Sequence, residues 1–422
     1  MAETGAPLGG IGSRHKETAF GPFREPLFRG LWIAAVVCYT GRWMQTVATG
    51  WLMTSLTTSP MLVALVQVAS SAPAFLLYIP AGAMADMFDR RRVLLFTQAW
   101  MVIAALALGI LTVSHWVTPG WLLALTLLMG IGAVANDPPW QAITHEVVSE
   151  QNFASAVALN SAGFNVARAV GPALSGIVIA AWGTATAFLL NAASMFGVVV
   201  FLLRWKRRPH EQAIPGKDVL AAIKVGFEYA QHSAAVRSVL IRTGAFSLGA
   251  SGLWALIPLI ARPYGSIGFG IMVGFFGLGA LLGAALLPAW RRAMSVDAMV
   301  AVSTLVYAVS TTISGFASGI VVQCTVLLFA GVGWIIVIAS LNVCAQIMSP
   351  PWLRARTLSM YLLVLQGGMA AGSAVWGAVA SRWGIAVSIS GAAVILTIGL
   401  VTARWHHLRA DRVDLRTTVV EG

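Results

Sequence analysis

The segment Gly82-Ala83-Met84-Ala85-Asp86-Met87-Phe88-Asp89-Arg90-Arg91-Arg92 decides how this chain folds. It is a short charged turn between two apolar runs, at 61–83 and 93–113. A run of about 20 apolar residues is long enough to cross a hydrocarbon layer of roughly 30 Å. The two runs therefore predict a helical hairpin that crosses a membrane twice.

The same alternation of apolar run and polar turn extends over nearly the whole chain. Of its 422 residues, 58% are hydrophobic and only 10% are charged, whereas a soluble domain carries about 25% charged residues. The composition predicts an all-α membrane protein with about twelve transmembrane helices. We expect these helices at 30–53, 61–83, 93–113, 121–143, 155–181, 184–203, 240–261, 268–288, 297–316, 321–345, 357–378 and 384–404.

The distribution of basic residues predicts the orientation. Most of the 27 Lys and Arg residues lie in the two tails and in alternate loops, and such an excess marks the cytoplasmic side of a membrane. Arg262 and Arg382 fall in outer loops, and Arg42 and Arg168 fall inside spans. Both termini are therefore expected in the cytoplasm.

An internal repeat divides the spans into two groups of six. A shift of 201 residues places Gly82 on Gly283, Arg91 on Arg292 and Trp182 on Trp383. The repeat predicts two pseudo-symmetric six-helix bundles with a substrate site between them near the membrane midplane. The expected divisions are a cytoplasmic tail at 1–28, bundles at 29–203 and 238–404, a cytoplasmic linker with an amphipathic helix at 204–237, and a cytoplasmic tail at 405–422.

Several functional classes find no support in the sequence. Ser149 stands where a zinc-protease helix that begins with His145-Glu146 needs its second histidine. Cys38, Cys324 and Cys344 lie in apolar runs, so we expect no metal site. The sequence contains no phosphate-binding loop of the form G-x-x-x-x-G-K-(S/T). The net charge of +12 is spread over the membrane loops and forms no nucleic-acid face. No enzymatic activity, cofactor or nucleic-acid partner is expected.

The charged turn resembles the signature of the major facilitator superfamily, G-x-x-x-D-(R/K)-x-G-(R/K)-(R/K). Gly82, Asp86, Arg90 and Arg91 match it, while Met87 and Asp89 depart from it. The resemblance implies a cytoplasmic gate, in which an acid accepts hydrogen bonds from helix ends or arginines across the two halves. Glu146 is a further candidate for this gate. The alternative is a basic loop that only sets the topology. The expected gate comprises Gly82, Asp86, Asp89, Arg90, Arg91 and Glu146.

Other motifs resemble the secretion-effector branch of this superfamily, which includes the enterobactin exporter and macrolide efflux pumps. They are Trp43-Met44-Gln45, Pro138-Pro139-Trp140-Gln141, and Asn165-Val166-Ala167-Arg168-Ala169-Val170-Gly171-Pro172. The resemblance implies export. Gly171, Pro172 and Gly176 also resemble a motif of antiporters, in which small residues and a proline permit close packing and a bend. Ordinary tight packing is the alternative for these three residues.

Charged residues inside spans are costly and are functional candidates by default. Asp137 is the carboxylate placed within an apolar run, so it is the candidate for proton coupling. The alternatives are a structural ion pair between Asp137 and Arg168, and a helix-end cap before Pro138. The remaining candidates were assigned to a substrate cavity, with helix–helix hydrogen bonding as the alternative for each polar one. The cavity candidates are Arg42, Gln45, Asn160, Arg168, Trp254, Trp334, Asn342 and Gln366.

The expected function is secondary active transport, with proton-coupled export of an amphipathic small molecule from a bacterial cytoplasmic membrane. The expected partners are a small-molecule substrate and the lipid bilayer, and the protein is expected to work as a monomer. An importer or facilitator of an organic anion, and a membrane receptor or scaffold with a transporter fold, are the alternatives.

Overall fold

The computed structural model describes residues 20–205, 233–350 and 353–408. Twelve helices of 17 or more residues fill these ranges, and no strand occurs in them. The first six are α1 (Pro26–Leu56), α2 (Pro60–Met87), α3 (Arg90–Val113), α4 (Pro119–Val147), α5 (Phe153–Trp182) and α6 (Thr184–Arg204). The second six are α8 (Ala234–Ile260), α9 (Gly265–Ala293), α10 (Val296–Phe316), α11 (Ile320–Ile347), α12 (Arg354–Trp383) and α13 (Ile385–Val401).

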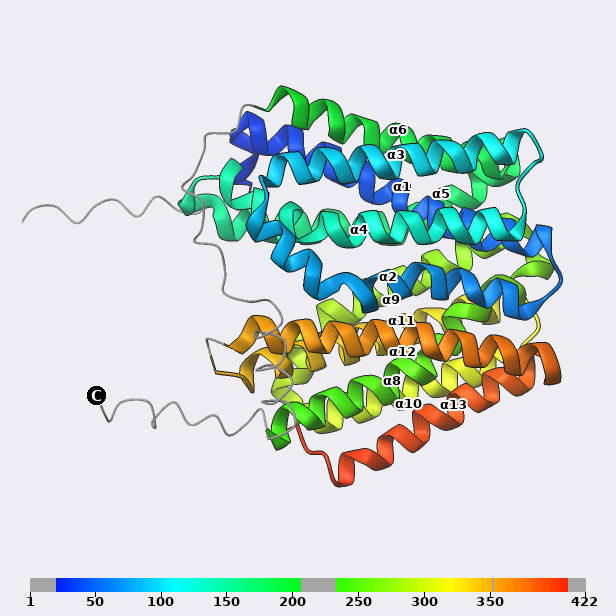
Figure 1. The fold of residues 1–422 in the computed structure, drawn as a ribbon. Coiled ribbons are helices and arrows are strands. Elements are labelled where there is room, and N and C mark those ends of the chain that lie inside the picture. Colours follow the sequence, from blue (N-terminus) through cyan, green and yellow to red (C-terminus); the bar gives the residue numbers. More distant parts are fainter. Residues whose placement is uncertain (1–19, 206–232, 351–352, 409–422) are drawn as a thin grey trace, which may run out of the picture.

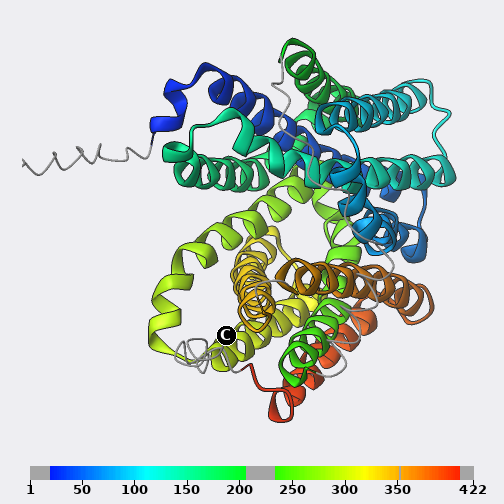
Figure 2. The same cartoon turned by 60° about the vertical axis from the view of Figure 1, so that its left-hand side comes forward.

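Each half is a bundle of six long helices, and the two bundles lie side by side (Figures 1 and 2). Within the described residues, ten segments are long and apolar enough to cross a membrane, and one of these contains both α8 and α9. The predicted all-helical class with two six-helix bundles is thus confirmed. The predicted amphipathic helix of the linker lies outside the described residues.

Successive helices run in opposite directions, so the molecule has two ends. We call the end where α1 begins and α13 finishes the tail face, and the other end the loop face (Figure 1). The expected repeat is visible in the turns of the loop face. Gly183 joins α5 to α6 with a φ of +82°, and Gly384 joins α12 to α13 with a φ of +88°. Only glycine adopts this conformation without strain, so the two halves use the same residue for the same turn.

The two halves meet mainly along two helix pairs, α2 with α12 and α5 with α9. At the α5–α9 crossing the backbones are so close that a Cβ added to Gly176 would lie 2.7 Å from the Ser266 carbonyl oxygen. A Cβ on Gly277 would lie 2.7 Å from the Arg168 carbonyl oxygen. Small residues are common where membrane helices approach this closely.

Contacts that close the interface gather toward the loop face. Trp51 of α1 stacks on Phe269 of α9 with ring centroids 6.3 Å apart. The Met61 amide of α2 donates to Ser381 Oγ of α12 at 2.9 Å. Toward the tail face α2 bends away from α11 and α12 (Figure 1), and it contains Pro73 and Pro80. Proline removes a helical hydrogen bond and kinks the helix that contains it.

Candidate functional site

A cavity of about 430 Å³ lies between the two halves. It is lined from the first half by α1, α2, α3, α4 and α6, and from the second by α8, α9 and α12. Its wall mixes aliphatic and aromatic side chains with polar ones, so it fits a molecule that has both characters. The polar lining residues are Arg42, Gln45, Thr46, Thr49, Gln67, Ser70, Tyr78, Thr126, Asp137, Asn191 and Gln366.

Five of the predicted site residues line this cavity, namely Arg42, Gln45, Asp137, Trp254 and Gln366. Asn160, Arg168, Trp334 and Asn342 do not line it, so their predicted place in the cavity wall was wrong. The physical reason is that each lies on a helix face that packs against another helix or points away from the cavity.

Arg42 and Asp137 face each other across the cavity wall. Arg42 lies in the middle of α1, and its Nη1 is 3.8 Å from Asp137 Oδ1 of α4. The two side chains are 40% and 38% exposed to the cavity or its openings, so both are reachable by a bound molecule. With both groups ionised the pair adds no net charge to the wall. The alternative pairing of Asp137 with Arg168 was wrong, because α1 rather than α5 presents an arginine to this carboxylate.

Arg168 lies instead between the two halves, among aromatic rings. Its guanidinium carbon is 5.5 Å from the centroid of Trp43 on α1 and 5.9 Å from that of Phe276 on α9. Both distances suit a cation–π contact. Its Nε is buried and has no hydrogen-bond partner.

Gln45 joins three helices of the first half. It accepts a hydrogen bond from Asn191 Nδ2 of α6 and contacts Met129 Sδ of α4. Two neighbouring polar atoms in the cavity wall have no protein partner: Asn191 Oδ1, an acceptor, and Trp254 Nε1, a donor on α8. Unpaired buried polar groups are costly, so these two atoms favour a ligand with complementary polar groups.

Trp334 stands one layer behind the wall. Its ring centroid is 5.9 Å from that of Trp254 and 6.2 Å from that of Phe276. The three rings support one another as a rigid aromatic cluster. Asn342 is engaged within its own helix, where its Oδ1 accepts from Gln346 Nε2 at 2.7 Å. Asn160 is half-buried on α5.

The sequence-based prediction missed the contribution of α2. Gln67, Ser70 and Tyr78 of this helix line the cavity. They recur at spacings of three and eight residues, which places them on one face of a helix. That polar face inside an apolar span is the signal by which they are recognisable in the sequence.

Two of the predicted gate residues stabilise the first half instead. Asp89 caps the N-terminus of α3, where its Oδ1 accepts from the Arg92 amide at 2.9 Å. Arg91 donates from Nε to the Leu202 carbonyl at 2.8 Å and from Nη2 to the Leu203 carbonyl at 2.9 Å. The last carbonyls of a helix have no partner inside it, and α6 ends here, beside α3. The prediction that Asp89 and Arg91 bridge the two halves was therefore wrong.

The other gate candidates give less to the geometry. Arg90 begins α3 on the tail face. The side chains of Gly82, Asp86 and Glu146 lie outside the described residues, so their gating role stays a prediction.

The predicted helix-packing motif serves two interfaces. A Cβ on Gly171 would lie 2.7 Å from Trp43 Cβ, so this glycine packs α5 against α1 within the first half. Gly176 and the Pro172 carbonyl face α9 of the second half, where a Cβ on Gly270 would lie 2.5 Å from that carbonyl oxygen. Close packing, which was the alternative for this motif, describes what these residues do in this conformation.

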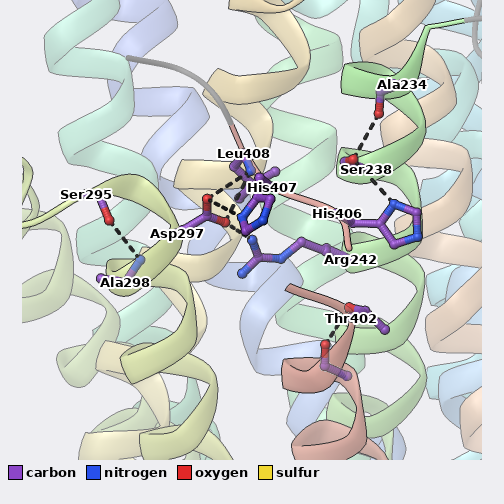
Figure 3. A network of polar contacts seen from close by, with 11 residues as sticks. Ala234, Ser238, Arg242, Ser295, Asp297, Ala298, Thr402, His406, His407 and Leu408 are labelled. Atoms are coloured by element: carbon purple, nitrogen blue, oxygen red, sulfur yellow. Dashed lines mark hydrogen bonds and ion pairs between the residues drawn. The ribbon is translucent and has the colours of Figure 1, made fainter. Parts of the chain in front are cut away.

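Two polar networks tie helix ends together on the tail face. In the second half, buried Arg242 of α8 pairs with Asp297 of α10, and the Leu408 amide donates to Asp297 Oδ2 at 3.0 Å (Figure 3). His407 Nδ1 lies 3.9 Å from the same Asp297 oxygen. This network fastens the segment after α13 to the bundle.

In the first half the carboxylate of Glu25 holds the turn between α4 and α5. It accepts from the Ser149 hydroxyl at 2.9 Å, from the Ser149 amide at 3.3 Å and from Asn152 Nδ2 at 2.9 Å. Partial burial raises the pKa of the Glu25 carboxyl, but these hydrogen bonds outweigh that effect and hold the pKa below its usual value.

Within the described residues, no group of three or more His, Cys, Asp or Glu side chains is arranged to hold a metal ion.

Comparison with known proteins places this architecture in a family. A family model described as "transmembrane secretion effector" matches residues 17–418. The chain belongs to this family of major facilitator transporters. It is therefore an integral multi-pass membrane protein, and its family is one of transporters rather than enzymes.

Curated relatives of the chain are transporters of small molecules. The chain is 25% identical to the enterobactin exporter EntS of Salmonella choleraesuis over 396 residues, which cover 89% of this chain and 93% of that one. It is 25% identical to the multidrug efflux pump Tap of Mycolicibacterium fortuitum over 69% of this chain and 74% of that one. It is also 25% identical to the staphyloferrin A transporter of Staphylococcus aureus, over 60% of this chain and 65% of that one.

Solved structures share the fold at low sequence identity. A bacterial homologue of the human lysosomal transporter Spinster, in an inward-facing and occupied conformation, matches with a TM-score of 0.73 and 14% identity. That match covers 92% of this chain and 98% of the other. The nucleoside transporter NupG matches with a TM-score of 0.69 and 14% identity, covering 89% and 98%.

Proposed function

We propose that this protein exports an amphipathic small molecule, siderophore- or drug-like, across a bacterial cytoplasmic membrane in exchange for protons. The observation that carries the proposal is the cavity between the halves, whose mixed wall contains one arginine paired with one carboxylate. The named functions of EntS and Tap support export.

The topology belongs to the same proposal. All twelve long helices cross the membrane, and the tail face lies in the cytoplasm with both termini. The basic loops on that face support this orientation. The contacts toward the loop face and the bend of α2 favour a conformation that opens to the cytoplasm, from which an exporter loads its substrate.

Asp137 is the proposed coupling group. A proton on Asp137 removes its charge, and Arg42 then has no ionised partner. Loss of the proton restores the pair. Because the pair lies in the cavity wall, its state changes the charge that a bound molecule meets. A coupled carrier needs the proton and the substrate to favour different conformations or to compete for one site.

The test is the direction of flux in inside-out membrane vesicles that contain the protein. Enterobactin, staphyloferrin A and ethidium serve as three probes. An acid vesicle lumen should drive accumulation of at least one probe, and collapse of the pH gradient should stop it. Proton-driven movement out of the lumen would contradict export.

Import or facilitated passage of an organic anion is the second candidate, because a cationic side chain, Arg42, stands in the cavity wall. The same vesicles separate the two functions. A facilitator equilibrates its probe without regard to the pH gradient, and an importer moves it toward the cytoplasmic side.

A further inference from the structure

A second, smaller cavity of about 280 Å³ lies inside the first half. It is bounded by α1, α3, α4, α5 and α6, and no residue of the second half lines it. We call it the side chamber. Arg42 and Asp137 line both the central cavity and the side chamber, so the ion pair stands between them.

The side chamber extends from the ion pair toward the tail face. On α1, which runs away from that face, Cys38 and Tyr39 precede Arg42. On α4, which runs toward it, Trp140 and Gln141 follow Asp137. The chamber thus approaches Asp137 from the side that we assign to the cytoplasm.

The polar groups of the side chamber are incompletely paired. Gln98 of α3 is only 2% exposed, its Nε2 donates to Asn136 Oδ1 at 3.2 Å, and its Oε1 has no partner. The Tyr39 hydroxyl accepts from Trp140 Nε1 at 2.8 Å, so its own proton is left for another acceptor. An unpaired acceptor this deeply buried is costly unless water or a ligand satisfies it.

Water fits this chamber better than a metal cation does. One water molecule takes up roughly 30 Å³ in the liquid, so the chamber has room for a small cluster. Arg42 places a positive charge beside the Asp137 carboxylate and disfavours a second cation there.

We propose that the side chamber holds a water cluster through which protons reach Asp137 from the tail face without passing through the substrate cavity. The proposal rests on the coupling role of Asp137. In the transfer, an O–H bond of a protonated water breaks, an O–H bond forms on Asp137, and neutral water remains. Substrate and proton then approach the Arg42–Asp137 pair from opposite sides.

The ionisable groups near Asp137 are few. Cys38, Tyr39 and Arg42 face it from α1, and Tyr78 faces it from α2 across the central cavity. The lining residues from α3, α5 and α6 are Gln98, Met101, Phe164 and Met195, none of which titrates near neutral pH. Asp137 is thus the proton acceptor of this wall.

The first test is radiolytic hydroxyl-radical footprinting of the intact protein in lipid nanodiscs, which reports bound water. Cys38 lines the chamber and is 6% exposed, while Cys344 lines neither cavity and is 1% exposed. Cys344 lies nearer to the tail-face end of its helix, so bulk water favours the control. Oxidation of Cys38 should be several-fold faster. Equal rates would overturn the proposal, and this comparison needs no variant.

The second test is infrared titration of the Asp137 carboxyl band, assigned by its loss in Asp137→Asn. Gln98→Leu should shift the midpoint of that titration. Thr97→Val is the matched control, because Thr97 also donates to Asn136 Oδ1 but does not line the chamber; it should leave the midpoint unchanged. Identical titrations of wild type and Gln98→Leu would overturn the proposal. Proton-driven transport that persists in Asp137→Asn would sink the coupling role instead, whatever the footprint shows.

Discussion

At the scale of single residues, the arginine of the cavity wall decides which charge the substrate may carry. Arg42→Ala removes the cation beside Asp137, and Arg42→Lys keeps it. A hydrogen bond to a charged group contributes about 1.5–3 kcal/mol, or roughly 10- to 150-fold in affinity. For the anionic dye carboxyfluorescein, Arg42→Ala should therefore weaken binding by this much, and Arg42→Lys by much less.

The control is ethidium, a cationic dye, which should bind to Arg42→Ala at least as well as to the wild type. Binding is measured by fluorescence anisotropy with purified protein. Equal losses in the two variants would point to a packing role for Arg42.

The Glu25 contacts give a pH dependence whose sign follows from the direction of the pKa shift. The pKa of Glu25 is lower in the folded protein than in the unfolded chain, so the stabilisation is present at neutral pH. It is lost as the pH falls through the usual carboxyl range toward the lowered folded value. Amide exchange at Ser149 should accelerate over that window in the wild type and be fast already at neutral pH in Glu25→Ala. A flat profile in the wild type would show that the carboxylate does not hold this turn.

At the scale of helices, the sequence predicted the elements more fully than the contacts between them. Length and hydropathy placed all twelve long helices, and the repeat located matching turns at Gly183 and Gly384. Both members of the Arg42–Asp137 pair were predicted as functional, but not as partners. Their pairing depends on how α1 and α4 are rotated against each other, which no local pattern encodes. The side chamber depends in the same way on five helices together.

The crossing of α5 and α9 makes a prediction at this scale. A methyl group at Gly176 meets the Ser266 carbonyl oxygen and the Ile267 Cα, both backbone atoms that must shift. Overpacking of this kind costs about 1–3 kcal/mol, so Gly176→Ala should lower the thermal midpoint and slow transport. Gly197→Ala is the matched control, because nothing lies within 4 Å of its added Cβ. Equal behaviour of the two variants would contradict a tight crossing.

The network after α13 gives a second prediction for helix ends. Asp297→Ala leaves Arg242, whose side chain is 4% exposed, without its anion. Breaking a buried pair costs up to about 3–5 kcal/mol, which thermal unfolding in detergent measures. His407 is 56% exposed, so His407→Ala should cost under about 1 kcal/mol. A larger effect from His407→Ala than from Asp297→Ala would show that the histidine, not the buried pair, secures this segment.

At the scale of the whole molecule, the arrangement separates two routes to one ion pair. The central cavity contacts both halves, so it can alternate between the two sides of the membrane as the halves rock. The side chamber belongs to the first half alone and moves with it. Coupling in this scheme depends on a single carboxylate, Asp137, that both routes reach.

The most direct test of the account measures proton movement with substrate movement in proteoliposomes. The purified protein is reconstituted with a pH-sensitive dye in the lumen, and the probe that the vesicle assay shows to be carried is added outside. In the wild type, entry of the probe should move protons out of the lumen. In Asp137→Asn, exchange of labelled for unlabelled probe should continue while the proton signal disappears. A proton signal of normal size in Asp137→Asn would contradict the account.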